Sequence, residues 1–317
     1  MLKSAYLIIC LFLFSYSNQS HAHDGEFHDY SSTSINQIST FKLGLFSLAN
    51  GQLQNRVSIT NKNGYRYIKA NNIPDHQTGN GIKGRNPHSI KEQNKTYKIT
   101  LTPKFAAKPT KSFPNAFGVA VNGVFFEPST AEFWRGNRSW NQEAINGNGK
   151  RLLGLDNNYA HVQPDGSYHY HGTPVGLIKN LAKKNKSRII LIGYAADGFP
   201  IYSQYGYSKA EDSKSKIIKL KSSYKLKRGK RPANGPPGKY DGTYTADYEY
   251  IKGSGDLDEF NGRFAITPEY PKGTYFYVVT DNFPFISRSW KGTPDKSFFK
   301  RGGPAGPPGR RPPRNGP

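Results

Sequence analysis

Frequent glycine, proline, asparagine and aspartate residues divide most of this chain into short runs of β-favouring residues. Apolar–polar alternation over about four to eight residues predicts half-buried strands. The predicted strands cover residues 41–47, 57–60, 65–70, 97–101, 188–194, 244–250 and 274–280. Segments this short leave space for only one or two short helices. We therefore expect a mainly β protein, a β-sandwich or a mixed sheet, with α+β as the alternative.

Specific residues mark two turns and one helix. Asn122-Gly123 lies between β-rich arms and predicts a two-residue type I′ hairpin turn. Pro164-Asp165-Gly166 predicts a three-residue hairpin loop, a type I turn with a bulge. Thr173-Pro174 predicts the start of a helix, with Thr173 as its cap and residues 177–181 on its apolar face. The strand predicted over 188–194 would complete a local β–α–β stretch.

The first 22 residues have the pattern of a secretory signal peptide. Lys3 precedes an apolar run from Ala5 to Tyr16, and Ser20-His21-Ala22 fits the small-x-small cleavage rule. The run is about a dozen residues, shorter than the roughly 20 that a membrane-spanning helix needs, so no transmembrane segment is expected. We expect cleavage between Ala22 and His23 and a secreted or periplasmic protein.

Removal of residues 1–22 takes away the only Met, the only Cys and one Lys, which lowers the formal net charge from +23 to +22. The mature chain would contain no sulfur, and therefore no disulfide and no thiolate ligand. A transition metal would have to bind histidine, carboxylate, amide or backbone groups.

His161, His169 and His171 fall within one predicted hairpin. With Gln163 and Ser167 closing the loop, His161 lies opposite His169, and His171 is two residues further along the same strand. Alternation places all three imidazoles on one face, with opposite Cβ atoms about 5 Å apart and diagonal ones about 7–8 Å apart. This arrangement predicts a site for Zn, Cu, Ni or Fe that leaves a position for water. The alternative is a sheet face covered by stacked His and Tyr side chains.

Three carboxylates are candidates to complete the metal shell or to act as a base: Asp156, Asp197 and Glu132. Asp156 precedes His161 by five residues, and Asp197 follows the strand predicted over 188–194. Asp156 and Asp197 are the predicted catalytic residues. A turn or helix-cap role is the alternative for each.

The new N-terminus is a second candidate site. A terminal His23 would offer its α-amine and imidazole to one Cu(II), and His28 lies close in sequence. This arrangement is similar to the histidine brace of copper oxygenases, which also needs a distant histidine. The alternative is a flexible terminus left by ordinary cleavage.

Longer stretches around the histidine hairpin resemble the YHYH family. The resemblance is carried by residues 155–172, which include Tyr168-His169-Tyr170-His171, and by residues 192–202, with further likeness at 118–123, 257–259 and 273–275. It runs from about residue 115 to residue 292. The resemblance implies an exported bacterial protein of uncharacterised biochemical activity, with no established catalytic residues.

The chain departs from the family pattern in two places. Relatives often have a Cys after the Asp-Glu pair and another near the end of the domain, where this chain has Phe260 and Ser289 or Trp290. Relatives also often carry Tyr-His-Tyr where this chain reads Tyr275-Phe276-Tyr277. If that histidine is a ligand in relatives, this chain lacks a fourth protein ligand.

Five parts follow from these patterns. They are a signal peptide at 1–22, a flexible segment at 23–39, a β-rich part at 40–104, the YHYH domain at 105–292 and a disordered Gly/Pro/Arg tail at 293–317. Within the domain, the Lys-rich residues 209–239 are expected to form a solvated insertion loop.

Two functions fit these observations. One is an exported metal-binding protein with a three-histidine site, acting as a metal-dependent hydrolase or oxidoreductase. The other is a non-catalytic basic module for anionic surface polysaccharide, lipopolysaccharide or extracellular nucleic acid, because Lys and Arg gather in residues 179–231 and in the tail. The chain has no phosphate-binding loop or dinucleotide fingerprint, so no nucleotide cofactor is expected.

Overall fold

The structure is a computed structural model that describes residues 53–78, 86–146 and 152–300. Internal contacts divide the chain into residues 1–39 and 40–317, and the described residues all belong to the second unit. The predicted signal peptide, His23, His28 and the strand predicted over 41–47 lie outside the described residues. Within the described ranges, no helix is long and apolar enough to cross a membrane.

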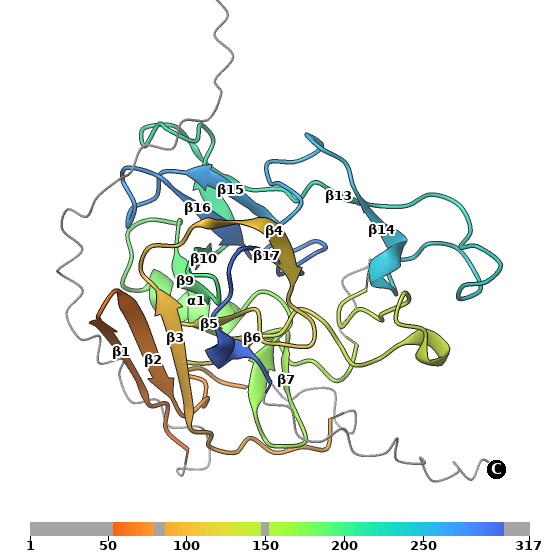
Figure 1. Cartoon of the computed structure of the whole chain (residues 1–317), viewed down its shortest axis with the longest axis horizontal. Coiled ribbons are helices and arrows are strands. Elements are labelled where there is room, and N and C mark those ends of the chain that lie inside the picture. The colour runs from red at the N-terminus through yellow and green to blue at the C-terminus, as the bar shows by residue number, and fades with distance from the viewer. Residues whose placement is uncertain (1–52, 79–85, 147–151, 301–317) are drawn as a thin grey trace, which may run out of the picture. The chain divides into compact units, whose positions relative to one another are not determined.

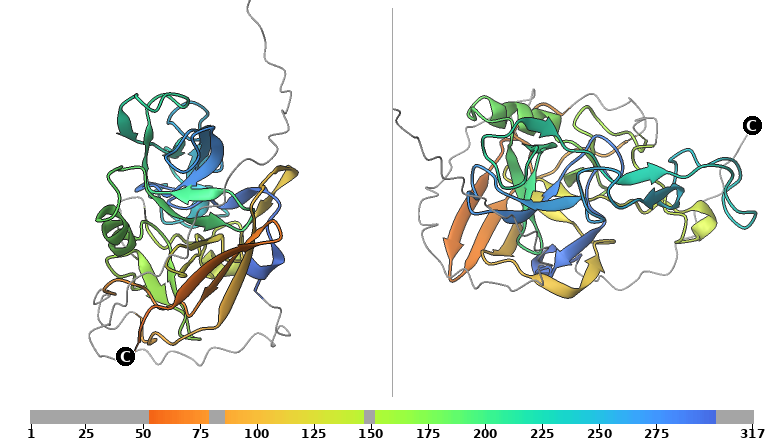
Figure 2. Two further views of the ribbon diagram at one scale, coloured as in Figure 1. Left: turned by 90° about the vertical axis from the view of Figure 1, so that its left-hand side faces the viewer. Right: turned by 90° about the horizontal axis from the view of Figure 1, so that it is seen from above.

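Three antiparallel strands form a small sheet in the order β1-β2-β3. They are β1 (Val57–Lys62), β2 (Tyr65–Ala70) and β3 (Lys95–Thr100), and they lie side by side in every view (Figure 1, Figure 2). These strands confirm the predictions at 57–60, 65–70 and 97–101. Asn63 and Gly64 join β1 to β2 with φ angles of 51° and 76°, the left-handed pair that a type I′ turn requires.

A larger mixed sheet of eight strands holds the histidine hairpin. Its order is β15-β16-β10-β9-β5-β6-β8-β7, with the β10–β16 and β6–β8 pairs parallel and the others antiparallel. The strands are β5 (Gly118–Ala120), β6 (Phe125–Phe126), β7 (Ala160–Val162), β8 (Tyr168–Tyr170), β9 (Leu191–Ala195), β10 (Pro200–Tyr202), β15 (Gly262–Ala265) and β16 (Thr274–Val278). The prediction of a mainly β protein with a mixed sheet is confirmed.

The helix α1 (Val175–Ala182) connects β8 to β9. The strand pairings make β8 and β9 run in the same direction, with β5 and β6 between them. The predicted β–α–β stretch is therefore a crossover over two intervening strands. The predicted cap was wrong: Pro174 is the N-cap without a side-chain bond, and the Thr173 hydroxyl donates to Asp281 instead.

Two-stranded ribbons and single 3-10 turns complete the described structure. The ribbons pair β4 (Phe105–Lys111) with β17 (Ser289–Gly292), β11 (Tyr205–Tyr207) with β12 (Ile217–Lys219), and β13 (Tyr224–Leu226) with β14 (Tyr248–Tyr250). The 3-10 turns are Trp134–Gly136, Thr245–Asp247 and Lys296–Phe298.

Residues 209–239 differ from the solvated loop that we expected. They contain β12 and β13, and Arg231 within them is buried. The Arg231 guanidinium donates to both oxygens of the buried Asp247 and to one oxygen of Asp241. The prediction rested on lysine content, which indicates only that many side chains of this segment are exposed. It carries no information on the tertiary hydrogen bonds that hold the backbone.

Residues 293–300 also have a defined structure, contrary to the predicted disordered tail. The turn Lys296–Phe298 buries Phe298, whose ring centroid lies 4.8 Å from that of Tyr97. The rest of the predicted tail, residues 301–317, lies outside the described residues.

Asn122-Gly123 forms a different turn from the one predicted. The loop is three residues long, the Ala120 carbonyl accepts from the Gly123 N–H, and only Gly123 has a positive φ, of 82°. The Asn122 side chain is buried and donates to Asp75 and Tyr170. These tertiary bonds hold Asn122 outside the left-handed region that a type I′ turn requires.

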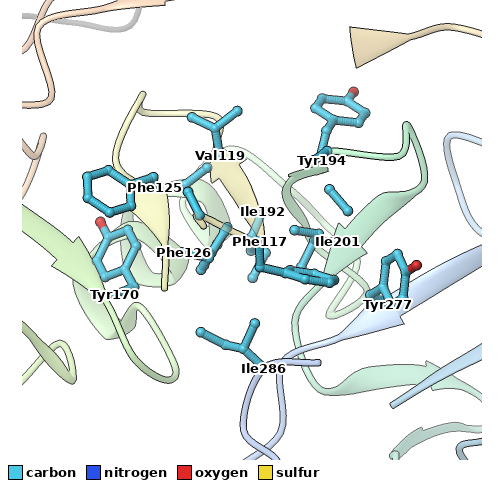
Figure 3. Close-up of a cluster of buried hydrophobic side chains, with 14 of the residues drawn as sticks. Phe117, Val119, Phe125, Phe126, Tyr170, Ile192, Tyr194, Ile201, Tyr277 and Ile286 are labelled. Atoms are coloured by element: carbon cyan, nitrogen blue, oxygen red, sulfur yellow. The ribbon is translucent and has the colours of Figure 1, made fainter. Parts of the chain in front are cut away.

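The main hydrophobic cluster joins the two sheets. Figure 3 shows rings and aliphatic side chains of the larger sheet meeting in this cluster, among them Phe117, Phe126 and Tyr170. Ile68 and Tyr97 of the three-stranded sheet belong to the same cluster. Residues on both sides of the predicted boundary between 104 and 105 therefore share one core.

Candidate metal centre

The β7–β8 hairpin has the predicted register. His161 lies opposite His169, and the Gln163 N–H donates to the Ser167 carbonyl at 2.9 Å to close the loop. Gly166 adopts a φ of 86° and completes the bulge. The predicted three-residue loop is confirmed, and it decides which side chains share a face.

The three imidazoles converge through their Nε2 atoms. His171 Nε2 lies 3.0 Å from His169 Nε2 and 3.2 Å from His161 Nε2. One ligand atom from each residue lies within 4.8 Å of the others, and no second such group of histidine, cysteine or acidic residues occurs in the described part of the chain. Metal–nitrogen bonds of about 2.0–2.1 Å at tetrahedral angles place nitrogen atoms roughly 3.3 Å apart. The three histidines, called the trio below, could therefore hold one metal ion.

The hydrogen bonds of the trio leave lone pairs for a cation. His161 Nδ1 lies 2.9 Å from the Leu153 carbonyl, which can only accept, so Nδ1 carries the proton and Nε2 the lone pair. His169 Nε2 and His171 Nε2 face each other, so at most one of them carries a proton. At least two of the three converging nitrogens are therefore acceptors.

Burial keeps the rings uncharged. It lowers the pKa of His169 and of His171 well below the usual histidine range, and the neighbouring histidines lower both further. Burial also lowers the pKa of His161, although its bond to Leu153 opposes the shift. Neutral imidazole is the form that binds metal ions, so the trio is ready to bind near neutral pH.

The aromatic ring of Phe125 borders the trio, and a buried carboxylate that we did not predict lies two residues further along the same segment. The Phe125 ring stacks on His169 with centroids 5.3 Å apart and planes 6° apart. Glu127 follows on the same chain segment and is buried, with bonds from Gln163 and Lys300. Nothing local in the sequence marks Glu127, because its place beside β8 depends on the parallel pairing of β6 with β8.

Tyr168 and Tyr170 point to the opposite face of β8, where both are buried. The Tyr168 hydroxyl donates to Asp156 Oδ2 at 2.6 Å. The Tyr170 hydroxyl lies 2.6 Å from His76 Nε2 and accepts from Asn122 Nδ2 at 2.9 Å. These bonds hold β8 from the face opposite the trio, and neither His76 nor Asn122 was predicted to have this role.

Neither predicted catalytic carboxylate belongs to the cluster of ligand atoms. Asp156 accepts from Tyr168, on the face away from the trio. Asp197 accepts from the Tyr277 hydroxyl and the Gly292 N–H, and burial raises the pKa of Asp197 to about 6. Asp197 follows β9, which is three strand spacings from β8, or roughly 14 Å at about 4.8 Å each. The catalytic role of both residues stays a prediction.

The other two candidates also lie outside the cluster. Glu132 is exposed on the segment between β6 and β7. Phe276 packs on Tyr202 with ring centroids 5.1 Å apart, in β16, five strand spacings from β8 or roughly 24 Å. A histidine at position 276 would not reach the trio in this fold.

Comparison with known proteins agrees with the resemblance seen in the sequence. A family model described as YHYH protein matches residues 96–292, which begin within β3 and end with β17. No curated protein and no solved structure matches the chain. The matched region covers more than half of the sequence and includes the whole trio. The chain therefore belongs to the YHYH protein family.

Proposed function

We propose that this protein is an exported metal-binding protein in which His161, His169 and His171 hold one transition metal ion, either Zn, Cu or Fe. The observation that carries the proposal is the convergence of three neutral imidazoles at nitrogen spacings of 3.0 and 3.2 Å. Imidazole binds all three metals well, and three ligands leave at least one position open. The single Cys lies in the predicted signal peptide, so the donor set contains no thiolate.

An open position next to three histidines suits hydrolytic or redox chemistry. A bound ion would supply either polarisation of water or electron transfer, depending on its identity. The chain itself contributes orientation and partial exclusion of water: Leu153 sets the tautomer of His161, and Phe125 covers one side of His169. A metal-dependent hydrolase or oxidoreductase is the enzyme class that we propose.

Metal analysis of the purified protein tests the proposal. We expect about one ion per chain in the wild type and its loss in the His169→Ala, His171→Ala double variant. His88→Ala is the matched control, because His88 is an exposed histidine outside the cluster. Equal metal content in the wild type and the double variant would refute the proposal, and the identity of the ion would separate hydrolytic from redox chemistry.

Export is the second part of the proposal. Residues 1–22 support it through their charge, apolar run and cleavage pattern. N-terminal sequencing of the protein recovered from the periplasm or the medium should give His23 as the first residue. Recovery of the chain with Met1 intact in the cytoplasm would contradict export.

A basic hollow supports a role in binding anionic polymers as the second candidate function. A depression of about 680 Å³ over the β13–β14 ribbon is lined by three cations, one acid, one tyrosine and two aliphatic residues: Lys225, Lys227, Arg228, Glu249, Tyr240, Leu226 and Ile251. Clustered cations beside an aromatic ring suit an acidic polysaccharide or another cell-surface polymer. Binding of heparin or alginate should weaken steeply between low and physiological salt, and the Lys225→Gln, Lys227→Gln variant should weaken it at low salt.

A further inference from the structure

Glu127 lies on the face of the sheet that carries the trio. β6 runs parallel to β8 with Phe125 opposite His169, and the two rings stack. Glu127 is two residues after Phe125, and its N–H donates to the Tyr170 carbonyl, which continues the same pairing. Side chains two residues apart in a strand point to the same face. The pairing therefore places the backbone of Glu127 beside that of His171, with the Glu127 side chain on the face of the trio.

Gln163 reaches Glu127 from the other side of β8. It directly follows β7, two residues after His161, and its bond to Ser167 continues the pairing, so it also shares the face of the trio. Gln163 Nε2 donates to Glu127 Oε2 at 2.5 Å. β7 and β6 flank β8, and Gln163 lies opposite Ser167, so the two side chains meet across β8.

Glu127 differs from an ordinary surface ion-pair partner. Lys300 Nζ lies 2.7 Å from Glu127 Oε1, but the Lys300 side chain is 49% exposed and that of Glu127 only 10%. Burial raises the pKa of Glu127 although Lys300 and Gln163 both oppose the shift.

We propose that Glu127 is an outer-sphere carboxylate of the metal centre, where it accepts a hydrogen bond from a protic ligand in the position that the trio leaves open. The ligand class is water or a small molecule with a hydroxyl or amide N–H next to its metal-binding atom. A carboxylate has about four acceptor positions, so two remain after the bonds from Gln163 and Lys300. Those two residues are positioning residues, because each fixes one carboxylate oxygen.

A carboxylate near the trio would compensate part of the charge of a bound metal ion. Three neutral imidazoles leave the full charge of a divalent ion uncompensated in a buried site, and a nearby carboxylate compensates part of it. No carboxylate among the described residues lies within the ligand cluster, so Glu127 acts through the exchangeable ligand. The inference rests on the proposed metal-binding function and adds the class of ligand that the site selects.

Two small ligands of different chemistry test the inference on Co(II)-loaded protein. Acetohydroxamate carries an N–H group beside its two metal-binding oxygens, whereas azide carries no proton. Their dissociation constants would be measured from the Co(II) visible spectrum in the wild type, Glu127→Gln and Glu132→Gln, which is the exposed control. We expect Glu127→Gln to weaken acetohydroxamate binding about tenfold or more. Azide binding should stay unchanged or become tighter, and Glu132→Gln should match the wild type for both ligands.

The outcomes separate the inference from the proposed function. Glu127→Gln protein that retains Co(II) and binds both ligands as the wild type does would overturn the outer-sphere role alone. An equal loss for both ligands would also overturn it, because that pattern indicates general loosening of the site. A wild type that takes up no Co(II) would refute metal binding itself, and the inference with it. If Glu127→Gln fails to fold, Gln163→Met provides the same comparison and should weaken acetohydroxamate selectively.

Discussion

The hydroxyl of Tyr170, on the face of β8 away from the trio, should contribute strongly to stability, and its removal should leave metal binding almost intact. Tyr170 accepts from Asn122 and donates to His76 Nε2, whose Nδ1 lies 3.0 Å from the Gln77 carbonyl. All members of this network are therefore paired. The substitution Tyr170→Phe removes the hydroxyl and keeps the ring that packs in the core.

The cost of this substitution follows from burial. Asn122 is 0% and His76 is 6% exposed, so water cannot replace the lost partner. Each buried polar group left unpaired costs about 1–3 kcal/mol. One N–H of Asn122 and the Nε2 of His76 lose their partner, so the free energy of unfolding should fall by roughly 3 kcal/mol. For a chain of this size such a loss lowers Tm by roughly 6–12 °C.

Urea unfolding of chelator-treated protein at pH 7.5 measures the effect. Tyr224→Phe is the matched control, because Tyr224 is partly exposed and its hydroxyl donates to the Glu259 carbonyl, which water can satisfy. The control should lose less than about 1 kcal/mol. Metal affinity of the Tyr170→Phe variant should stay within about tenfold of the wild type, because the hydroxyl lies on the face away from the trio.

Two results would refute this reasoning. A loss no larger than that of the Tyr224→Phe control would mean that the buried network does not hold β8. A loss of metal affinity beyond about a hundredfold, without a comparable loss of stability, would mean that Tyr170 acts directly on the trio.

Three further predictions concern charge and metal. Burial raises the pKa of Asp197 to about 6 from the value of 3.8 in an unfolded chain, so the folded protein binds this proton more tightly. The folded protein therefore loses stability as the pH rises from about 4 to 6, and the loss reaches about 3 kcal/mol at pH 7. Asp197→Asn removes the titration, so its unfolding free energy relative to wild type should improve by about 1.4 kcal/mol between pH 5 and pH 7.5, and a pH-independent difference would contradict the raised pKa. Arg231→Met leaves the fully buried Asp247 without its cation and should lower the free energy of unfolding in urea by about 3–5 kcal/mol. The double variant Arg231→Met, Asp247→Leu should recover part of this loss. No loss in the single variant would disprove a structural role for this ion pair. Zn(II) at about 100 times its dissociation constant should add about 2.7 kcal/mol and raise Tm by roughly 5–10 °C in a thermal melt, and an equal rise in His171→Ala would exclude the trio as the site.

The histidine hairpin could be predicted because it is local. Pro164-Asp165-Gly166 sets the loop, and the two-residue period of a strand then decides that His161, His169 and His171 share a face. All of this lies within eleven residues of the chain. The strands β1, β2 and β3 were predictable for the same reason, since each is a short alternating run next to a turn.

Local patterns failed where distant residues compete for a side chain. Asn122-Gly123 has the residues of a type I′ turn, yet Asn122 donates to Asp75 and Tyr170 and the turn changes. The Lys-rich composition of 209–239 likewise gave no sign of the buried Arg231. In both cases a tertiary hydrogen bond outweighed a local preference.

The sequence by itself therefore determined the β class, the family and the one face on which three imidazoles meet. Only the tertiary structure decided that Glu127 borders this face, that His76 supports β8 and that Asp197 lies several strands away. The Glu127–Gln163 bond spans 36 residues and the His76–Tyr170 contact spans 94. Such contacts depend on the order of strands in the sheet, which periodicity within a single segment cannot express.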